Sequence, residues 1–434
     1  VDASRWWLRR PNLFAGRTLT APTLSGRQDW ATRHIALRGQ AFTPGVVRGL
    51  ESALFDTTGG LAGTRLALLQ GQGLAVDGED VRVPQAIEVA LADLPVVADP
   101  SAFAGMGGAG GGAGSVAGKM VGPALGAVVS ASPAALPRVG ILLLQPVSAD
   151  RIGEFDATDP CALDGCGSGN VAAFEDWRIG DAARLLWYAW PEEFLSLPAM
   201  PAGMPGRWRN DLAWRVFDAE AALGPDESLP WESFGVPLGL VACADDWTPL
   251  FLDRASVVRS GGHARHGRIG GIAGGLDIHW RLPALWQARL EQLAEQIAAA
   301  GDTAPDAATL AADFARLPPF GLLPANVVDL GNLASDFFPG SFTLDAAPLP
   351  SEQLDAAVAE AVSLAPLDLA LGERVRLLVP VPQAVFEPRL LIREVIDPEF
   401  AATLAEFVLR RARALGNRQG LRQRAAVDRK STRL

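Results

Sequence analysis

The spacing of apolar positions predicts one helix and then a block of short strands in the first hundred residues. Trp30, Ile35 and Leu37 follow the capping residues of 20–25 and precede Thr43-Pro-Gly45, a pattern that predicts a helix between two loops. Asp77-Gly78 lies between two of the aliphatic runs that follow and predicts a hairpin, because such a turn requires positive φ angles. The runs predict a small antiparallel sheet and occupy residues 66–69, 74–76, 81–83 and 86–91.

A segment rich in Gly and Ala interrupts this pattern. Lys119 is the only charged residue between Asp99 and Arg138, and residues 105–118 are nearly all Gly and Ala, which predicts a loop or interdomain linker over 100–138. The uncharged stretch 120–137 approaches the length of a membrane span. Three prolines interrupt it, and Gly and Ala contribute little transfer energy, so we do not expect it to enter a membrane.

Strand patterns return after this segment, and helical spacing dominates the end of the chain. Apolar runs predict strands at 139–144, 183–190, 236–242, 248–252 and 374–380. Amphipathic spacing predicts helices at 211–220, 285–300, 308–317, 351–364 and 397–416.

The whole pattern predicts a multi-domain α+β protein with antiparallel, β-rich N-terminal and central modules and a more helical C-terminal region. Residues 1–99 form the N-terminal helix plus small β module, 100–138 the linker, 139–281 the β-rich central module and 282–427 the α/β C-terminal region. The ending DRKSTRL, 428–434, resembles translated adapter sequence, so we expect an artefactual tail. Since the chain also starts at Val1, we expect a fragment of a longer protein.

Composition narrows the classes of partner. The 38 Lys and Arg residues against 49 Asp and Glu give a net charge of −11, which argues against nucleic acid or an anionic membrane as the main partner. The hydrophobic fraction of 49% excludes disorder along the whole chain. Three cysteines do not form the framework of a secreted disulfide protein, and the opening residues lack the pattern of a signal peptide, so we expect a cytoplasmic protein.

Motifs of nucleotide binding and catalysis match this sequence only formally. Gly105-x-Gly107-x-x-Gly110 fits a dinucleotide fingerprint but does not follow a strand, and Lys119 precedes Met120 where a phosphate loop requires Ser or Thr. Ser168 lacks the flanking glycines of a nucleophile elbow. We therefore expect neither an enzyme nor a bound cofactor.

Two pairs of residues are weak candidates for a metal site. Cys161 and Cys166 could combine with His263 and His266 to hold zinc, while the alternative is a plain loop with a free thiol or a local disulfide. His34 lies on the first predicted helix and is interpreted as a packing or surface residue.

Tryptophan is unusually frequent, with 12 residues against one Tyr. Six of them crowd the central region, where they could build a core, an interaction surface or a carbohydrate platform, and core packing is the favoured interpretation. These six are Trp177, Trp187, Trp190, Trp208, Trp214 and Trp231.

Several motifs resemble one group of bacterial proteins. The entry motif comprises 16–21, Arg27-Gln28, His34 and Pro44-Gly-Val-Val-Arg-Gly-Leu50, and the hairpin motif is Leu74-Ala-Val-Asp-Gly-Glu-Asp-Val-Arg-Val-Pro84. Residues 160–161, Cys166, 174–177, 235–238 and 253–254 add further likeness. Together they resemble large uncharacterised bacterial proteins associated with phage-tail-like contractile injection systems. The Gly-rich segment 105–118 is not part of this pattern.

The resemblance implies a structural role. A baseplate or tail-associated component would dock on other protein subunits of a large assembly and would have no catalytic centre. Short strands with exposed edges are compatible with this role, because they can complete their sheets on a partner. The competing hypotheses are a Trp-rich surface or carbohydrate-binding module and a metal-dependent hydrolase that uses the Cys and His residues above.

Overall fold

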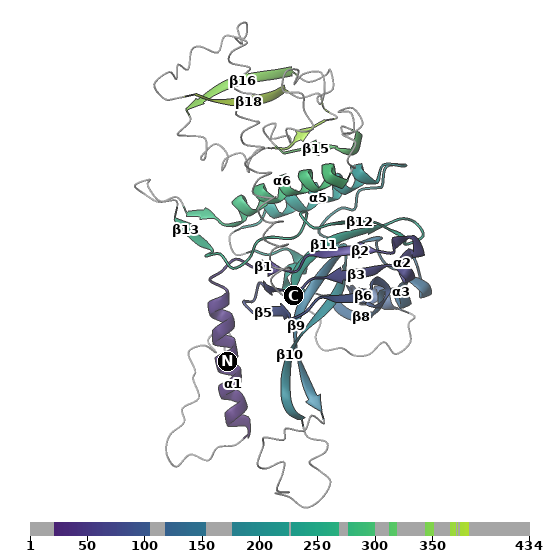
Figure 1. Cartoon of the computed structure of the whole chain (residues 1–434), viewed down its shortest axis with the longest axis vertical. Coiled ribbons are helices and arrows are strands. Elements are labelled where there is room, and N and C mark those ends of the chain that lie inside the picture. The colour runs from purple at the N-terminus through teal and green to yellow at the C-terminus, as the bar shows by residue number, and fades with distance from the viewer. Residues whose placement is uncertain are drawn as a thin grey trace, which may run out of the picture. The chain divides into compact units, whose positions relative to one another are not determined.

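The chain folds into two compact units, each built from two separate stretches of sequence (Figure 1). A computed structural model describes residues 21–104, 118–152, 176–224, 227–268, 277–299, 312–318, 343–350, 365–369, 371 and 374–381. Unit 1 comprises Val1–Pro191 and Gly224–Trp280, and unit 2 comprises Glu192–Leu223 and Arg281–Leu434. The predicted α+β class is confirmed. The unit boundaries differ from the sequence-based division because helix α5, inside the predicted central module, belongs to unit 2.

The N-terminal helix is confirmed as α1 (Ala21–Gly39), and a bent ribbon follows it. Strand β1 (Gly45–Gly49) pairs antiparallel with β4 (Gly71–Leu74). Strand β2 (Ser52–Phe55) pairs antiparallel with β3 (Arg65–Leu68). Their register is continuous, because Gly49 faces Gly71 and Ser52, three residues further on, faces Leu68. Between the two halves, Gly49 and Leu50 have φ angles of 61° and 59°, so the ribbon bends there into two different sheets.

One additional strand completes each of these sheets. β5 (Asp80–Val83) pairs with β4, and β6 (Ile87–Ala90) pairs with β3. The predicted Asp77-Gly78 hairpin is confirmed between β4 and β5, with a φ angle of 89° at Gly78. Where the sequence predicted one small sheet, the structure has two three-stranded sheets, since the bend at Leu50 divides the ribbon. A 3-10 turn (Thr57–Gly59) and α2 (Gly60–Gly63) connect β2 to β3.

A six-stranded sheet forms the rest of the unit 1 core. Its order is β12-β11-β9-β10-β7-β8, and all neighbours are antiparallel except the parallel pair β10 and β7. All four strands predicted between 139 and 252 are confirmed. The strands are β7 (Pro95–Ala98), β8 (Met120–Ala124), β9 (Val139–Ile152), β10 (Asp176–Ala189), β11 (Val236–Cys243) and β12 (Pro249–Asp253).

The expectation of a loop or linker over 100–138 is wrong for part of that segment. Strand β8 and helix α3 (Leu125–Ala131) lie within it, and a 3-10 turn (Pro100–Phe103) begins it. Leu125 and Val128 are fully buried in the core of unit 1. Burial of apolar surface is favourable, and this uncharged, aliphatic stretch achieves it inside the protein. Residues 105–117 lie outside the described residues.

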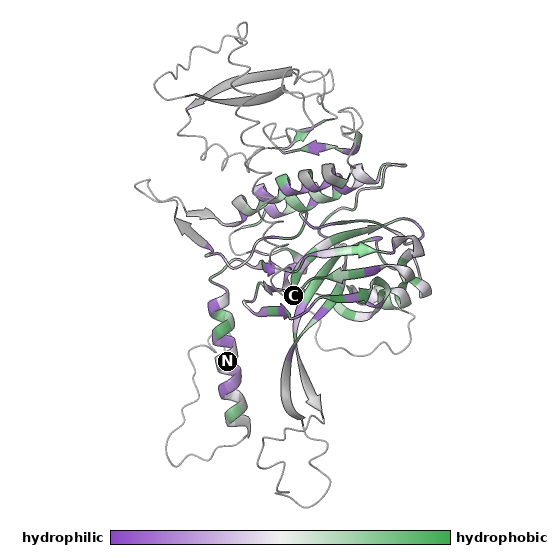
Figure 2. Cartoon of the chain, viewed as in Figure 1, coloured by the Kyte–Doolittle hydropathy of each residue, from purple (hydrophilic) through white to green (hydrophobic). Residues whose placement is uncertain are grey.

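The three sheets share one hydrophobic core, to which all of them contribute buried aliphatic residues. Figure 2 shows the hydrophobic positions concentrated along the strands of unit 1. Every residue of β11 is buried. Gly140 on β9 lies under the indole of Trp187 on β10, where a Cβ atom would come within 2.2 Å of the ring. Glycine at position 140 therefore leaves the space that the Trp187 ring occupies.

Among its described residues, unit 2 has two packed helices and two small sheets. Helix α5 (Pro205–Ala221) contacts α6 (Arg281–Ala299), which confirms the helices predicted at 211–220 and 285–300. Strand β15 (Arg316–Leu317) pairs with β17 (Leu367–Asp368), and β16 (Thr343–Pro350) pairs in parallel with β18 (Arg374–Val381), the strand predicted at 374–380. The predicted helix 308–317 is wrong at its end, which is extended. The predicted helices 351–364 and 397–416 lie outside the described residues.

Candidate interaction surface

Strands β9 and β10 extend beyond the six-stranded sheet as a two-stranded ribbon, visible in Figure 1. They pair with each other from Gly140 and Ala189 to Ile152 and Asp176. Strand β11 pairs with β9 only as far as Leu144. We define the β9–β10 ribbon as residues 145–152 and 176–184. Eight residues of extended chain correspond to about 27 Å of projection.

Both outer edges of the β9–β10 ribbon lack a neighbouring strand among the described residues. The last pair between β11 and β9 joins Val236 to Leu144, and a Cβ atom on Gly235, the residue before β11, would come within 2.5 Å of the Leu144 carbonyl oxygen. On the other side, β10 meets β7 only at Trp187 and Tyr188. The main-chain N–H and C=O groups along these edges are therefore available to a further strand.

The base of the β9–β10 ribbon carries small and apolar side chains with little charge. Val147 faces Ala182, and Pro146 faces Ala183. These residues are exposed or half-buried. Below them Arg184 donates two hydrogen bonds to the side-chain oxygen of Gln145, at 3.2 and 2.5 Å, which closes the ribbon where it meets the sheet. A partner strand would thus meet small and apolar side chains at 146–147 and 182–183, next to Arg184, whose guanidinium is bound to Gln145.

Helix α1 is the second exposed element of unit 1. None of its residues with a described side chain is buried, and Figure 2 shows hydrophilic and hydrophobic positions mixed along it. Its C-terminal end is held by the hairpin turn, since Gly78 packs directly on the Ala36 carbonyl and Gln40 donates to the Asp77 carbonyl at 2.8 Å. Within the helix, His34 stacks on Trp30 with ring centroids 3.9 Å apart, which confirms its interpretation as a packing or surface residue.

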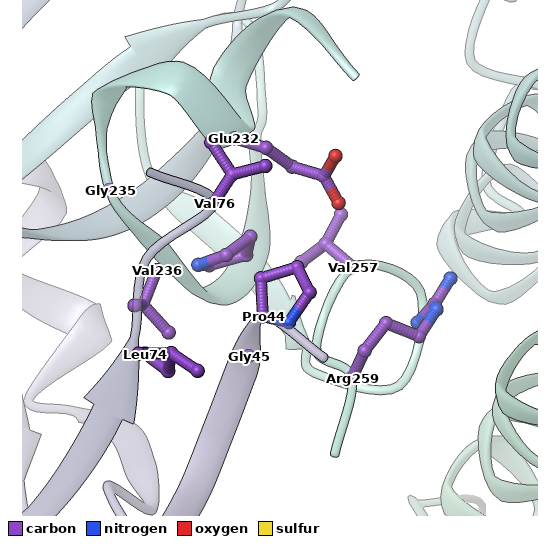
Figure 3. A pocket seen from close by; sticks show the side chains of 10 residues that line it. Pro44, Gly45, Leu74, Val76, Glu232, Gly235, Val236, Val257 and Arg259 are labelled. Carbon is purple, nitrogen blue, oxygen red and sulfur yellow. The ribbon is translucent and has the colours of Figure 1, made fainter. Parts of the chain in front are cut away.

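A shallow pocket lies between β1, β4 and the start of β11 (Figure 3). Both Glu232 and Arg259 line the pocket. Glu232 accepts a hydrogen bond from the Leu229 amide at 2.8 Å and so caps the turn Pro230–Phe234. Arg259 donates to carbonyl groups of its own segment, those of Ala255, Ser256 and Val258. Local structure therefore engages both charged groups, and the pocket offers little for a small molecule to bind.

The candidate zinc ligands are only partly described. His263 is exposed, and its Nε2 atom lies 3.1 Å from the Ser260 hydroxyl. His266 begins β13 (His266–Arg268), which pairs with β14 (Asp277–His279). Cys161 and Cys166 lie outside the described residues, so the zinc site stays a prediction. In the described part of the chain, no three His, Cys, Asp or Glu residues are grouped as metal ligands.

The remaining cysteine is a core residue. Cys243 is a buried free thiol at the end of β11. Burial raises the pKa of its thiol to about 12, which suppresses the thiolate form that nucleophilic catalysis and metal binding require. The geometry gives Cys243 a packing role.

The central tryptophans build the interior. Among the six named in the sequence analysis, the five with described side chains are at most 2% exposed: Trp187, Trp190, Trp208, Trp214 and Trp231. This confirms the core interpretation for these five and removes them from any surface platform for carbohydrate. Trp177 is the second residue of β10, and its side chain is outside the described set.

Two features of this surface were absent from the sequence-based prediction. The apolar runs located only the inner parts of β9 and β10, since the β9–β10 ribbon lacks the continuous aliphatic pattern of a buried strand. The pairing of Val147 with Ala182 depends on long-range register, which no local signal shows.

Comparison with models of known protein families and with curated proteins yields no match. No helix in the described ranges combines the length and apolar character needed to cross a membrane.

Proposed function

We propose that this chain is a structural component of a phage-tail-like contractile particle, baseplate or tail-associated, that docks on neighbouring protein subunits through the β9–β10 ribbon. The observation that carries the proposal is the extension of β9 and β10 beyond the strands that flank them in the sheet. An isolated two-stranded ribbon is marginally stable in water, and a third strand or a packed surface stabilises it. A ribbon of this length is therefore well suited to a partner's surface.

Strand addition is the mode of docking that the ribbon favours. The main-chain groups of residues 145–152 and 176–184 provide affinity that does not depend on sequence, and the side chains at the base provide specificity. Pro146 has no N–H group, so it removes one donor from the edge of β9, whereas the edge of β10 keeps all of its donors. We infer that the β10 edge receives the partner strand.

The sequence resemblance supports the kind of assembly. Its two most specific motifs lie in unit 1. The entry motif places Arg27, Gln28 and His34 on the exposed helix α1 and Pro44–Leu50 on β1 and the bend, while residues 16–20 lie outside the described residues. The hairpin motif 74–84 runs from the end of β4 through the turn and β5. Both motifs therefore belong to a helix, strands and turns of the scaffold. They therefore fit a scaffold that presents docking elements rather than a catalytic centre.

A ribbon deletion tests the proposal. We would replace residues 146–183 by Asn-Gly, which joins the paired residues Gln145 and Arg184 by a two-residue hairpin loop of the favoured type. The wild-type chain, purified from its native host, is expected to bring down sheath, tube or baseplate subunits. The deletion variant is expected to lose them while its thermal unfolding midpoint stays within a few degrees of wild type.

A matched control places a change on another edge strand of the same sheet. Leu250→Ser alters an exposed residue of β12 and leaves the ribbon intact, so its partner capture is expected to equal that of wild type. Capture of the same subunits by the deletion variant would refute docking through the ribbon. A wild-type chain that brings down no such subunit would refute the contractile particle.

A further inference from the structure

The β13–β14 hairpin places two of the four histidines of the chain directly opposite each other. His266 is the first residue of β13 and His279 is the last residue of β14, and the antiparallel register pairs these two positions. Residues directly opposite in an antiparallel pair lie on the same face of the sheet, with Cβ atoms about 4.5–5.5 Å apart. The backbone therefore brings two histidine positions close enough to share one ion.

This spacing suits two imidazole ligands of one transition-metal ion. Zinc binds a histidine nitrogen at about 2.0–2.1 Å, so two nitrogens on a tetrahedral ion lie about 3.4 Å apart, less than the separation of the two Cβ atoms. Imidazole is a suitable ligand for zinc, copper, nickel and iron. The neighbouring pair on the same face, Arg268 opposite Asp277, has no net formal charge, so it adds no excess positive charge beside a cation.

The register changes the ligand set that the sequence suggested. The sequence pattern combined His266 with His263 and two cysteines, whereas the strands pair His266 with His279. The Nε2 atom of His263 instead lies 3.1 Å from the Ser260 hydroxyl. A site at positions 266 and 279 requires neither His263 nor a cysteine.

One end of the hairpin is fixed to the rest of unit 1. The Arg265 amide donates to the Ala41 carbonyl at 3.0 Å, and the Arg265 guanidinium donates to the Phe42 carbonyl at 2.8 Å. His266 is the next residue along the chain. One of the two paired positions is therefore held next to an anchored residue, at the base of the hairpin.

The hairpin is short enough for a bound ion to stabilise it. Its strands pair over three positions, and the eight connecting residues, 269–276, include four glycines. A two-stranded hairpin is marginal in water, and glycine increases the entropy that is lost when a loop is ordered. An ion bound to positions 266 and 279 would close this loop at its base, and its binding free energy would contribute to the stability of the hairpin.

We propose that the His266–His279 position of the β13–β14 hairpin is a binding site for one divalent transition-metal ion. Two neutral imidazoles bind the ion, water completes its coordination, and the ion links the two strands at the base of the hairpin. The proposal goes beyond the assembly role and does not depend on it, because β13 and β14 share no residue with the β9–β10 ribbon.

Zinc titration of the full-length chain is the direct test. The metal-free chain is titrated with Zn²⁺ under reducing conditions, in the presence of a chromophoric chelator that competes for the ion. His266→Ala and His279→Ala are each expected to weaken zinc binding by about 100-fold or more, because the loss of an outer-shell partner alone costs about 10- to 100-fold in affinity. A wild-type chain that binds no zinc would overturn the proposal.

Two control variants separate this site from other ligands. His34→Ala makes the same substitution on helix α1, and Cys161→Ser/Cys166→Ser removes the thiols of the alternative site. Both are expected to keep the zinc affinity of wild type. Undiminished binding by the double variant His266→Ala/His279→Ala would overturn the proposal. Loss of binding in the cysteine variant would also overturn it, because thiolates would then be among the ligands.

Hydrogen exchange of the wild-type chain provides a readout that requires no variant to fold. An ion that binds only the closed hairpin is expected to slow the exchange of amides within 266–279 by up to about 100-fold, when free Zn²⁺ is 100 times its dissociation constant. The peptide of helix α5 is the internal reference and is expected to exchange at an unchanged rate. Exchange in 266–279 that does not respond to zinc would overturn the proposal. These readouts use no partner subunit, so failure of the contractile-particle assignment would leave them unchanged.

Discussion

Replacing Asn210 by Ala is expected to destabilise unit 2 strongly, because one side-chain oxygen serves two main-chain amides. Asn210 is 1% exposed and accepts from Ala315 and Arg316. Its truncation leaves both N–H groups without this acceptor, and a buried unsatisfied donor costs about 1–3 kcal/mol. Ala315 is 8% exposed, whereas water can reach Arg316 more easily, so the expected loss is about 2–4 kcal/mol.

A second alanine variant on the same helix provides the matched control. Asp218 pairs with Arg316 at 2.8 Å, but its side chain is 46% exposed, and an exposed ion pair contributes about 0–1 kcal/mol. Both substitutions introduce Ala within α5 and so share a helix-propensity gain of up to about 0.7 kcal/mol. The difference between the two variants therefore reports the buried amide contacts.

Hydrogen exchange measured by mass spectrometry is the suitable assay, because two units need not unfold in one transition. In the peptide that contains residues 312–318, Asn210→Ala is expected to increase the exchange rate by about 30-fold or more, and Asp218→Ala by about fivefold at most. Equal effects of the two variants would refute the reasoning, since they would show that the amide contacts contribute no more than a surface ion pair.

Three further predictions concern other positions. Gly140→Ala is expected to lower the free energy of unfolding of unit 1 by about 1–3 kcal/mol or more, as measured by thermal denaturation, because the added methyl overlaps the Trp187 ring. Cys243, whose pKa is raised to about 12 by burial, is expected to resist a thiol reagent at pH 8 in a chain with the other cysteines changed to Ser, and to react fully after unfolding. Burial also raises the pKa of Asp313, so its carboxylate opposes folding at neutral pH, and Asp313→Asn is expected to raise the melting temperature at pH 7. That gain is expected to disappear as the pH falls below the unfolded-state pKa of about 3.9, and a gain unchanged at pH 3 would contradict the assignment.

Local signals predicted the elements whose conformation depends on a few neighbouring residues. Asp77-Gly78 specified its hairpin through turn chemistry, and the run 139–144 specified a buried strand through its apolar content. The bend at Leu50 was missed because a leucine with a φ angle of 59° is disfavoured locally and exists only because its side chain is completely buried.

Tertiary contacts decided the regions where the sequence-based prediction failed. β8 and α3 were assigned to a linker from composition, although the apolar residues of that stretch complete the core of unit 1. Residues 316–317 have helical spacing, yet they are extended because Asn210 and Trp214, about a hundred positions earlier, bind their main chain. The β9–β10 ribbon likewise depends on register between distant strands.

The two units present extended main chain in complementary ways. In unit 1, the β9–β10 ribbon offers edges whose hydrogen-bonding groups lack a strand partner among the described residues, so a partner must supply a strand. In unit 2, helix side chains and strand β17 already bind the main chain of residues 313–317, so this segment needs no further strand. Strand addition to the ribbon adds new hydrogen bonds, whereas the segment of unit 2 already has partners within the same chain. Association of this protein through the ribbon should therefore respond mainly to changes that block a strand edge.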